Sequence, residues 1–135
     1  MRTLEEIFNE AVEHKATAII NGDGYEARLL YGIRISRDNK TQEIVIEDST
    51  SSGDYYRELN DEDYQLFLDN SWKYGVYVLS LNNLRRKLDL IEIKIGDEIS
   101  SRNNEKYIKQ QIQSRDNVLN RYATINNKLT KLNQV

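Results

Sequence analysis

Apolar residues recur at alternating steps of three and four along much of the second half of the chain. The first run is Tyr74, Tyr77, Leu81, Leu84, Leu88, Ile91 and Ile95. Such spacing keeps side chains on one face of a helix and is typical of helices that pack at a shallow angle. The pattern therefore predicts a long helix with one continuous apolar row.

A second run begins after the polar stretch 100–104, and it starts in a new phase, with one irregular step near Tyr122. Its positions are Ile108, Ile112, Arg115, Leu119, Tyr122, Ile125, Leu129 and Leu132. The change of phase predicts that the chain turns back, which gives an antiparallel hairpin of two helices, each about 28 residues and roughly 40 Å long. The alternative is one continuous helix of about 60 residues in a parallel oligomer.

The first half of the chain combines one helical pattern with an alternating one. Thr3 and Glu6 form a capping-box pattern, and the apolar spacing that follows predicts a helix over residues 4–14. Residues 17–20, 26–36 and 42–48 are rich in β-branched and alternating apolar residues. With turns at 21–24 and 37–40, they predict a three-stranded antiparallel meander with one face against the first helix.

A linker-like stretch at residues 49–56 separates the two halves. After it, Asn60 is a good N-cap for a short helix that reaches about residue 70, and Ser71 can cap the next one. The predicted fold is α+β: an N-terminal helix and a β-meander, then a short helix and a long helical hairpin. We expect a helix-plus-meander part at 1–56 and a helical-hairpin part at 57–135.

Charge and composition narrow the class of protein. No apolar run approaches the roughly 20 residues that a membrane span needs, and no secretory signal pattern opens the chain, so we expect a cytoplasmic protein. The chain has no cysteine, which excludes disulfides and thiolate chemistry. Residues 101–135 carry 7 basic and 2 acidic side chains, a balance that suits the solvated face of a helix. We do not expect nucleic-acid binding.

Candidate catalytic, cofactor and metal patterns are weak. His14 is the only histidine, and it stands where a helix C-terminus favours a cation. Asp61, Glu62 and Asp63 occupy the first turn of a helix, where the dipole favours acids and where three neighbours point in different directions. The turn at 21–24 lacks the spacing of a calcium or phosphate loop, and residues 51–53 lack a nucleophile-elbow context. The sequence predicts no enzyme, cofactor or metal.

Two sets of residues are candidates for contacts with a protein partner. Seven of the 12 aromatic residues crowd into positions 55–77. Tyr55, Tyr56, Arg57 and Trp72 are candidates for a partner-binding surface, because these residue types dominate interface hot spots. The alternative is that the aromatic residues of this stretch all belong to the core. The second set lies off the predicted apolar rows of the hairpin and is expected to mediate self-association. It consists of Leu79, Leu90, Ile93 and Val118.

These patterns favour a non-enzymatic structural or adaptor protein that self-assembles, most simply a homo-oligomer, through its hairpin. Asn and Ile make up about a fifth of the chain and proline is absent, which suits an AT-rich genome. A phage or mobile-element component, such as a particle subunit in the host cytoplasm or virion, fits that usage. The alternative function is an inhibitor or regulator that occludes a host protein or nucleic acid.

Overall fold

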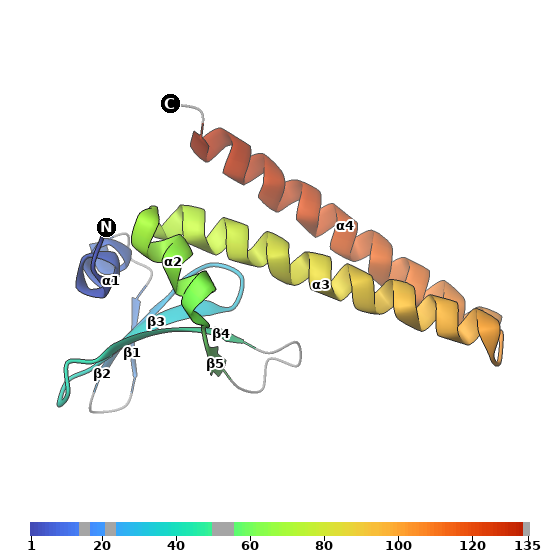
Figure 1. The fold of residues 1–135 in the computed structure, drawn as a ribbon, viewed down its shortest axis with the longest axis horizontal. Helices are drawn as coiled ribbons and strands as arrows, with labels where there is room; N and C mark the ends of the chain where they lie inside the picture. The colour runs from blue at the N-terminus through green and yellow to red at the C-terminus, as the bar shows by residue number, and fades with distance from the viewer. Residues whose placement is uncertain (14–16, 21–23, 50–55, 134–135) are drawn as a thin grey trace. The chain divides into compact units, whose positions relative to one another are not determined.

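The computed structural model describes residues 1–13, 17–20, 24–49 and 56–133. The elements in chain order are α1 (Leu4–Glu13), β1 (Thr17–Ile20), β2 (Gly24–Arg28), β3 (Ile33–Asp38), β4 (Ile44–Ser49), β5 (Tyr56–Glu58), α2 (Asp61–Asp69), α3 (Trp72–Ser100) and α4 (Glu105–Asn133) (Figure 1). They confirm the predicted α+β class. The chain divides into two compact units, residues 1–76 and 77–135, with the boundary inside α3.

The sheet is an antiparallel meander in which each strand pairs with the next along the chain, in the order β1-β2-β3-β4-β5. The meander was predicted, but its division into strands differs from the prediction. Residues 26–36 were expected to form one strand, whereas β2 ends at Arg28 and β3 begins at Ile33. Between them, Tyr31 and Gly32 have φ angles of 61° and 78°, and the amide of Leu29 donates to the carbonyl of Ile33. A left-handed turn therefore folds the expected strand into a hairpin.

The last strand, β5, begins inside the segment 49–56 that was expected to be a linker, and β4 ends inside it. Tyr56 pairs with Ser49, and Glu58 pairs with Glu47. Beyond β5, the amide of Leu59 donates to the carbonyl of Ile46 at 3.1 Å. Residues 50–55, which hold most of the predicted linker, lie outside the described residues.

The two faces of the sheet differ because side chains alternate along each strand. One face carries the buried residues Ala27, Ile33, Ile35 and Ile46. Helix α1 packs on this face through Ile7, Phe8 and Ala11, all buried, and Arg37 of β3 lies over the Phe8 ring at 5.0 Å. Figure 1 shows α1 and α2 on the same side of the sheet. The core of the first unit therefore lies between these helices and this face.

The predicted caps of the helices are present. The amide of Glu6 donates to Thr3 Oγ1 at 3.1 Å, the amide of Asp63 to Asn60 Oδ1 at 2.8 Å, and the amide of Tyr74 to Ser71 Oγ at 3.3 Å. These bonds satisfy amides that a helix leaves unpaired at its start.

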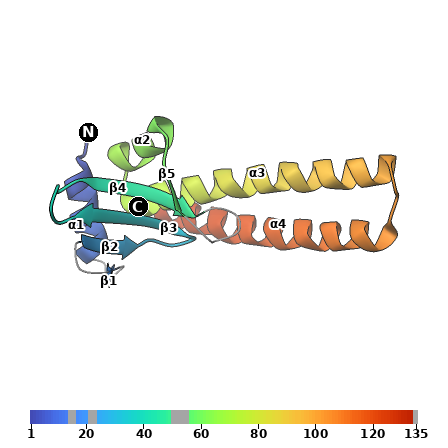
Figure 2. The ribbon, with the colours of Figure 1, turned by 90° about the horizontal axis from the view of Figure 1, so that it is seen from below.

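The second unit contains the predicted helical hairpin rather than one continuous helix. Helices α3 and α4 run antiparallel (Figure 2). Asn103 has φ 50° and its amide donates to the carbonyl of Glu98 at 2.6 Å, an arrangement that ends α3. Polar contacts also join the helices. Glu92 accepts from Arg115 at 3.3 Å, and the Arg85 guanidinium donates to the Tyr122 hydroxyl at 2.6 Å.

The apolar row predicted for α3 is inside the protein. Five of its seven members are buried and the other two are half-buried. On α4 the row differs by one residue from the prediction, because Val118 is 4% exposed and Leu119 is 47% exposed. With Val118 in place of Leu119, the spacing from Arg115 to Leu132 becomes a regular alternation of three and four. The irregular step inferred near Tyr122 is therefore absent.

Candidate functional site

The four residues predicted to mediate self-association fall into two classes. Leu79 and Val118 are 1% and 4% exposed, so they are interior residues of this structure. Leu90 and Ile93 are each 58% exposed. Of these four residues, only Leu90 and Ile93 are thus available on the surface of the hairpin.

Leu90 and Ile93 lie on the side of α3 opposite its buried row. Successive residues of an α-helix are about 100° apart, so these two side chains are neighbours about 60° apart. The same geometry places Leu90 about 140° and Ile93 about 160° around the helix from the buried side chains of Ile95 and Tyr77. The exposed pair therefore faces away from the interior of the hairpin.

Two polar residues continue this face in both directions. Arg86 lies four residues before Leu90, and Asp97 lies four residues after Ile93; both are exposed. We call Arg86, Leu90, Ile93 and Asp97 the α3 strip. The Arg86 guanidinium donates to Asn83 Oδ1 at 2.8 Å, on the same face. The strip has a basic end, an apolar centre and an acidic end.

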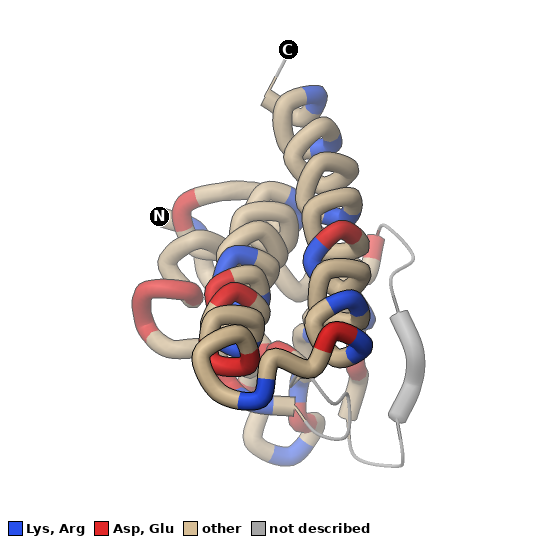
Figure 3. Tube along the Cα trace, turned by 90° about the vertical axis from the view of Figure 1, so that its right-hand side faces the viewer, with Lys and Arg blue, Asp and Glu red and all other residues tan. Residues whose placement is uncertain are grey.

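The strip is part of a wider separation of charge along α3. Arg85, Arg86 and Lys87 are consecutive, whereas residues 89–98 contain four acids and one lysine. Figure 3 shows basic and acidic positions along both helices of the hairpin. Two more large apolar side chains are exposed among the described residues of this unit, Ile99 at 55% and Leu119 at 47%. The hairpin surface thus combines ordered charge with large exposed apolar side chains.

The structure does not gather the predicted aromatic surface into one patch. Tyr55 lies outside the described residues, and Arg57 is exposed on β5. Tyr56 is half-buried, and the Arg34 guanidinium lies 3.6 Å above its ring. Trp72 is 4% exposed, and its amide donates to Glu10 of α1, which packs on the opposite face of the sheet from Arg34. Tyr56 and Trp72 therefore belong to different surroundings.

A charged network that the sequence did not reveal occupies the polar face of the sheet. The Glu26 side chain is fully buried, and its carboxylate accepts from Arg34 at 2.7 Å and from Arg28 at 3.3 Å. Arg34 also donates to Glu47 at 3.1 Å. Burial lowers the pKa of the Arg34 guanidinium, but its bonds to Glu26 and Glu47 outweigh this and raise the pKa above its ordinary value. The network holds three strands together by paired charges.

Tyr64 joins α2 to the end of the sheet. Its hydroxyl accepts from the amide of Ile46 at 3.0 Å and donates to Glu58 at 3.0 Å. Burial raises the pKa of the Tyr64 hydroxyl to about 12, and the carboxylate of Glu58 contributes. The hydroxyl thus takes the place of a strand partner where β5 ends.

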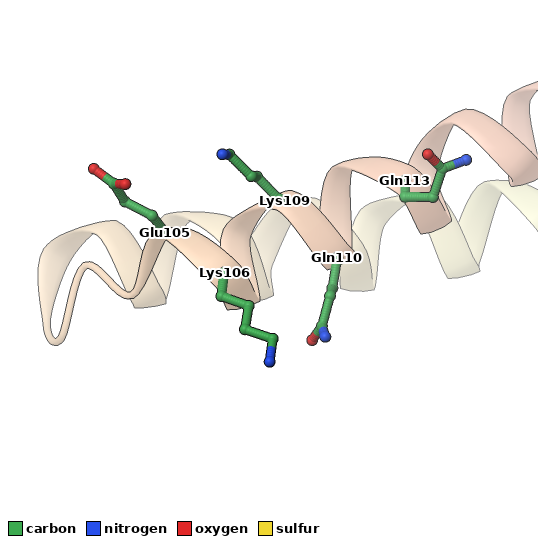
Figure 4. A pocket seen from close by; sticks show the side chains of 5 residues that line it. All are labelled: Glu105, Lys106, Lys109, Gln110 and Gln113. Carbon is green, nitrogen blue, oxygen red and sulfur yellow. The ribbon is translucent and has the colours of Figure 1, made fainter.

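A hollow on the outer surface of α4 is open to solvent and does not form an enclosed chemical site. It is lined by Glu105, Lys106, Lys109, Gln110 and Gln113. Figure 4 shows their side chains pointing to different sides of the helix instead of toward a common centre. Within the described ranges, no group of three or more His, Cys, Asp or Glu is placed to hold a metal ion, Asp61, Glu62 and Asp63 included. His14 and residues 21–23 and 51–53 lie outside those ranges.

In the part of the chain that the structure describes, no helix is both long and apolar enough to cross a membrane. Comparisons with protein-family models, with curated proteins and with solved structures find no significant match to this chain.

Proposed function

We propose that this chain is a non-enzymatic structural or adaptor protein that acts by protein–protein association through the outer surface of its helical hairpin. The observation that supports this proposal is the exposure of Leu90 and Ile93 on α3, which are neighbours on one face and are each 58% exposed. Single exposed apolar residues are ordinary on a protein surface, but large ones side by side on one helix face favour a contact site.

The size of the effect can be estimated from the exposed fractions. Full burial of a leucine or isoleucine side chain is worth about 1.5–3 kcal/mol. Covering the exposed parts of Leu90 and Ile93 would contribute roughly 2–3 kcal/mol from this one surface. Association itself costs about 4–15 kcal/mol, so the partner must supply a comparable surface and matching charges. We therefore expect a single contact to be weak and to depend on protein concentration. Binding becomes strong when many copies of the contact are repeated in an assembly.

The composition favours a phage or mobile-element setting for such a protein, for example a particle subunit. In that setting the protein would act in the host cytoplasm or in the virion. An inhibitor or regulator that occludes a host partner could use the same surface.

Light scattering on the wild-type protein and a Leu90→Asp, Ile93→Asp double variant tests the proposal. Both residues are already exposed, so charges there should leave the melting temperature nearly unchanged. Leu30→Asp is a matched control, because Leu30 is 42% exposed and lies in the other unit.

We expect the wild type and the control to exceed the monomer mass, alone or with a stoichiometric protein partner, and the double variant to lose that excess. The proposal is wrong if the wild type remains a monomer at high concentration, copurifies with no stoichiometric partner, and the double variant behaves identically.

A further inference from the structure

The α3 strip has the same spacing when it is followed from either end. Arg86, Leu90, Ile93 and Asp97 are separated by four, three and four residues, and all lie on the side of α3 away from its buried row. The two ends carry opposite charges, and the two central residues are both apolar. A helix face with this symmetry is complementary to a copy of itself in the reverse direction.

We propose that the partner of the α3 strip is a second copy of this chain, packed antiparallel about a two-fold axis between Leu90 and Ile93. This inference rests on the proposed function and names the partner and the geometry. The two-fold axis places Leu90 of one copy opposite Ile93 of the other, and Arg86 opposite Asp97. Each contact then occurs twice, as in any isologous interface.

Charge decides between the antiparallel and parallel arrangements. In a parallel pair the same residues meet, so Arg86 would face Arg86 at one end of the strip and Asp97 would face Asp97 at the other. Antiparallel packing replaces both like-charge contacts with arginine–carboxylate pairs. Arg86 uses one guanidinium nitrogen for Asn83, which leaves further N–H donors for a carboxylate. The charged ends of the strip therefore favour the antiparallel pair.

The residues that flank the strip set its edges. Helical geometry places Lys87 and Lys94 along one edge, and Asp89 and Gly96 along the other. In the antiparallel pair, Lys94 of one copy lies near Lys87 of the other, where both long side chains can extend into water. A Cβ added at Gly96 would have no heavy atom within 4 Å, so this edge leaves room for Asp89 of the second copy.

The extent of the strip limits the strength of the pair. Leu79 falls on the same face of α3 but is 1% exposed, so the accessible part runs from about Asn83 to Ser100. This length is about 27 Å of helix, which is short for a stable dimer interface. We expect a weak, reversible dimer with a dissociation constant on the order of 100 μM.

Disulfide trapping tests the geometry, because the chain has no cysteine of its own. Arg86→Cys and Asp97→Cys variants, distinguished by a mass tag, are oxidised separately and as a mixture. Antiparallel packing places residues 86 and 97 opposite each other, whereas the two copies of residue 86 are about 16 Å apart along the helix axis, beyond disulfide reach. We expect covalent heterodimers in the mixture and little product in either variant alone. Self-linking of Arg86→Cys that equals or exceeds linking to Asp97→Cys would overturn the antiparallel arrangement.

A charge exchange provides a second test that needs no covalent bond. Arg86→Asp and Asp97→Arg, each alone, should raise the dissociation constant of the dimer about tenfold, because each brings like charges together. The double exchange should return it to within about threefold of wild type. Circular dichroism verifies that these exposed substitutions leave the fold intact.

The outcomes separate this inference from the proposed function. If the wild type self-associates but the double exchange restores nothing, the antiparallel pair is wrong and association through the hairpin stands. If the wild type is a monomer whose binding to a different protein is lost in the Leu90→Asp, Ile93→Asp variant, the second copy is the wrong partner and the proposed function stands. If neither association occurs, both fail.

Discussion

Replacing Tyr64 by phenylalanine tests how α2 is joined to the sheet. The change removes one oxygen atom and keeps the ring. The amide of Ile46, which donates to that oxygen at 3.0 Å, then loses its acceptor, and Glu58 loses a donor. Ile46 is fully buried, so water cannot readily replace the missing partner.

The size of the effect follows from that burial. An unsatisfied buried donor costs about 1–3 kcal/mol, whereas the bond to Glu58 lies at an exposed position and adds little. At about 2.1 cal/mol/K of unfolding entropy per residue, a loss of about 1–3 kcal/mol lowers the melting temperature by roughly 4–10 °C for a chain of this size. Thermal unfolding followed by circular dichroism measures the change. Tyr107→Phe is the matched control, since the Tyr107 hydroxyl has no hydrogen-bond partner among the described residues.

The raised pKa of Tyr64 predicts a pH dependence of known sign. Its pKa is about 12 in the folded protein and about 10 when unfolded, so between these values the unfolded chain loses the phenolic proton first. Folding stability should therefore fall as pH rises from about 10 to 12, and Tyr64→Phe should lack that component of the fall. Equal melting temperatures for wild type and Tyr64→Phe at neutral pH, together with equal alkaline slopes, would refute the reasoning.

Three further predictions concern the polar face of the sheet, the hairpin and the charge of α4. Glu26→Gln should destabilise the protein by about 2–4 kcal/mol in denaturant unfolding, because Arg34 then loses the negative charge of its buried carboxylate partner. An unchanged free energy of unfolding would show that water already solvates the network. Gly96→Ala should raise stability by about 0.5–1 kcal/mol, since the site is exposed within a helix and a Cβ meets nothing; a loss would indicate an unrecognised contact. Shift assays with DNA and RNA should show no specific binding at physiological salt, and sub-micromolar affinity with a steep salt dependence would make α4 a binding surface.

The sequence predicted the helices better than the sheet, for physical reasons. The caps at Thr3, Asn60 and Ser71 and the apolar row of α3 are local patterns, and the structure contains them. The turn at Tyr31 and Gly32 was missed because a tyrosine with φ 61° is uncommon, and an apolar run around a single glycine resembles one strand. Gly32 was the residue in the sequence that could have indicated the turn. The structure requires glycine there, because a Cβ at this position would collide with the Ser49 hydroxyl on the neighbouring strand.

The candidate surface was only partly predictable. Apolar residues off the main row were identified, but burial depends on neighbours that periodicity does not specify, so Leu79 and Val118 could not be told from Leu90 and Ile93. The choice between Val118 and Leu119 shifts the row on α4 by one position, about 100° around the helix. Glu26 could not be recognised as buried, because its partners come from other positions on the sheet.

Association through the outer face of α3, and not through its buried row, is the central proposal. The most direct test is a dilution series observed through the methyl NMR signals of Leu90, Ile93, Ile91 and Ile95. Leu90 and Ile93 are 58% exposed, whereas Ile91 and Ile95 lie on the same helix and are 4% and 8% exposed, so they are internal controls. We expect the Leu90 and Ile93 signals to shift as concentration rises toward about 1 mM, while the Ile91 and Ile95 signals stay in place. Four unmoving signals, or equal shifts in all four, would contradict association through this face.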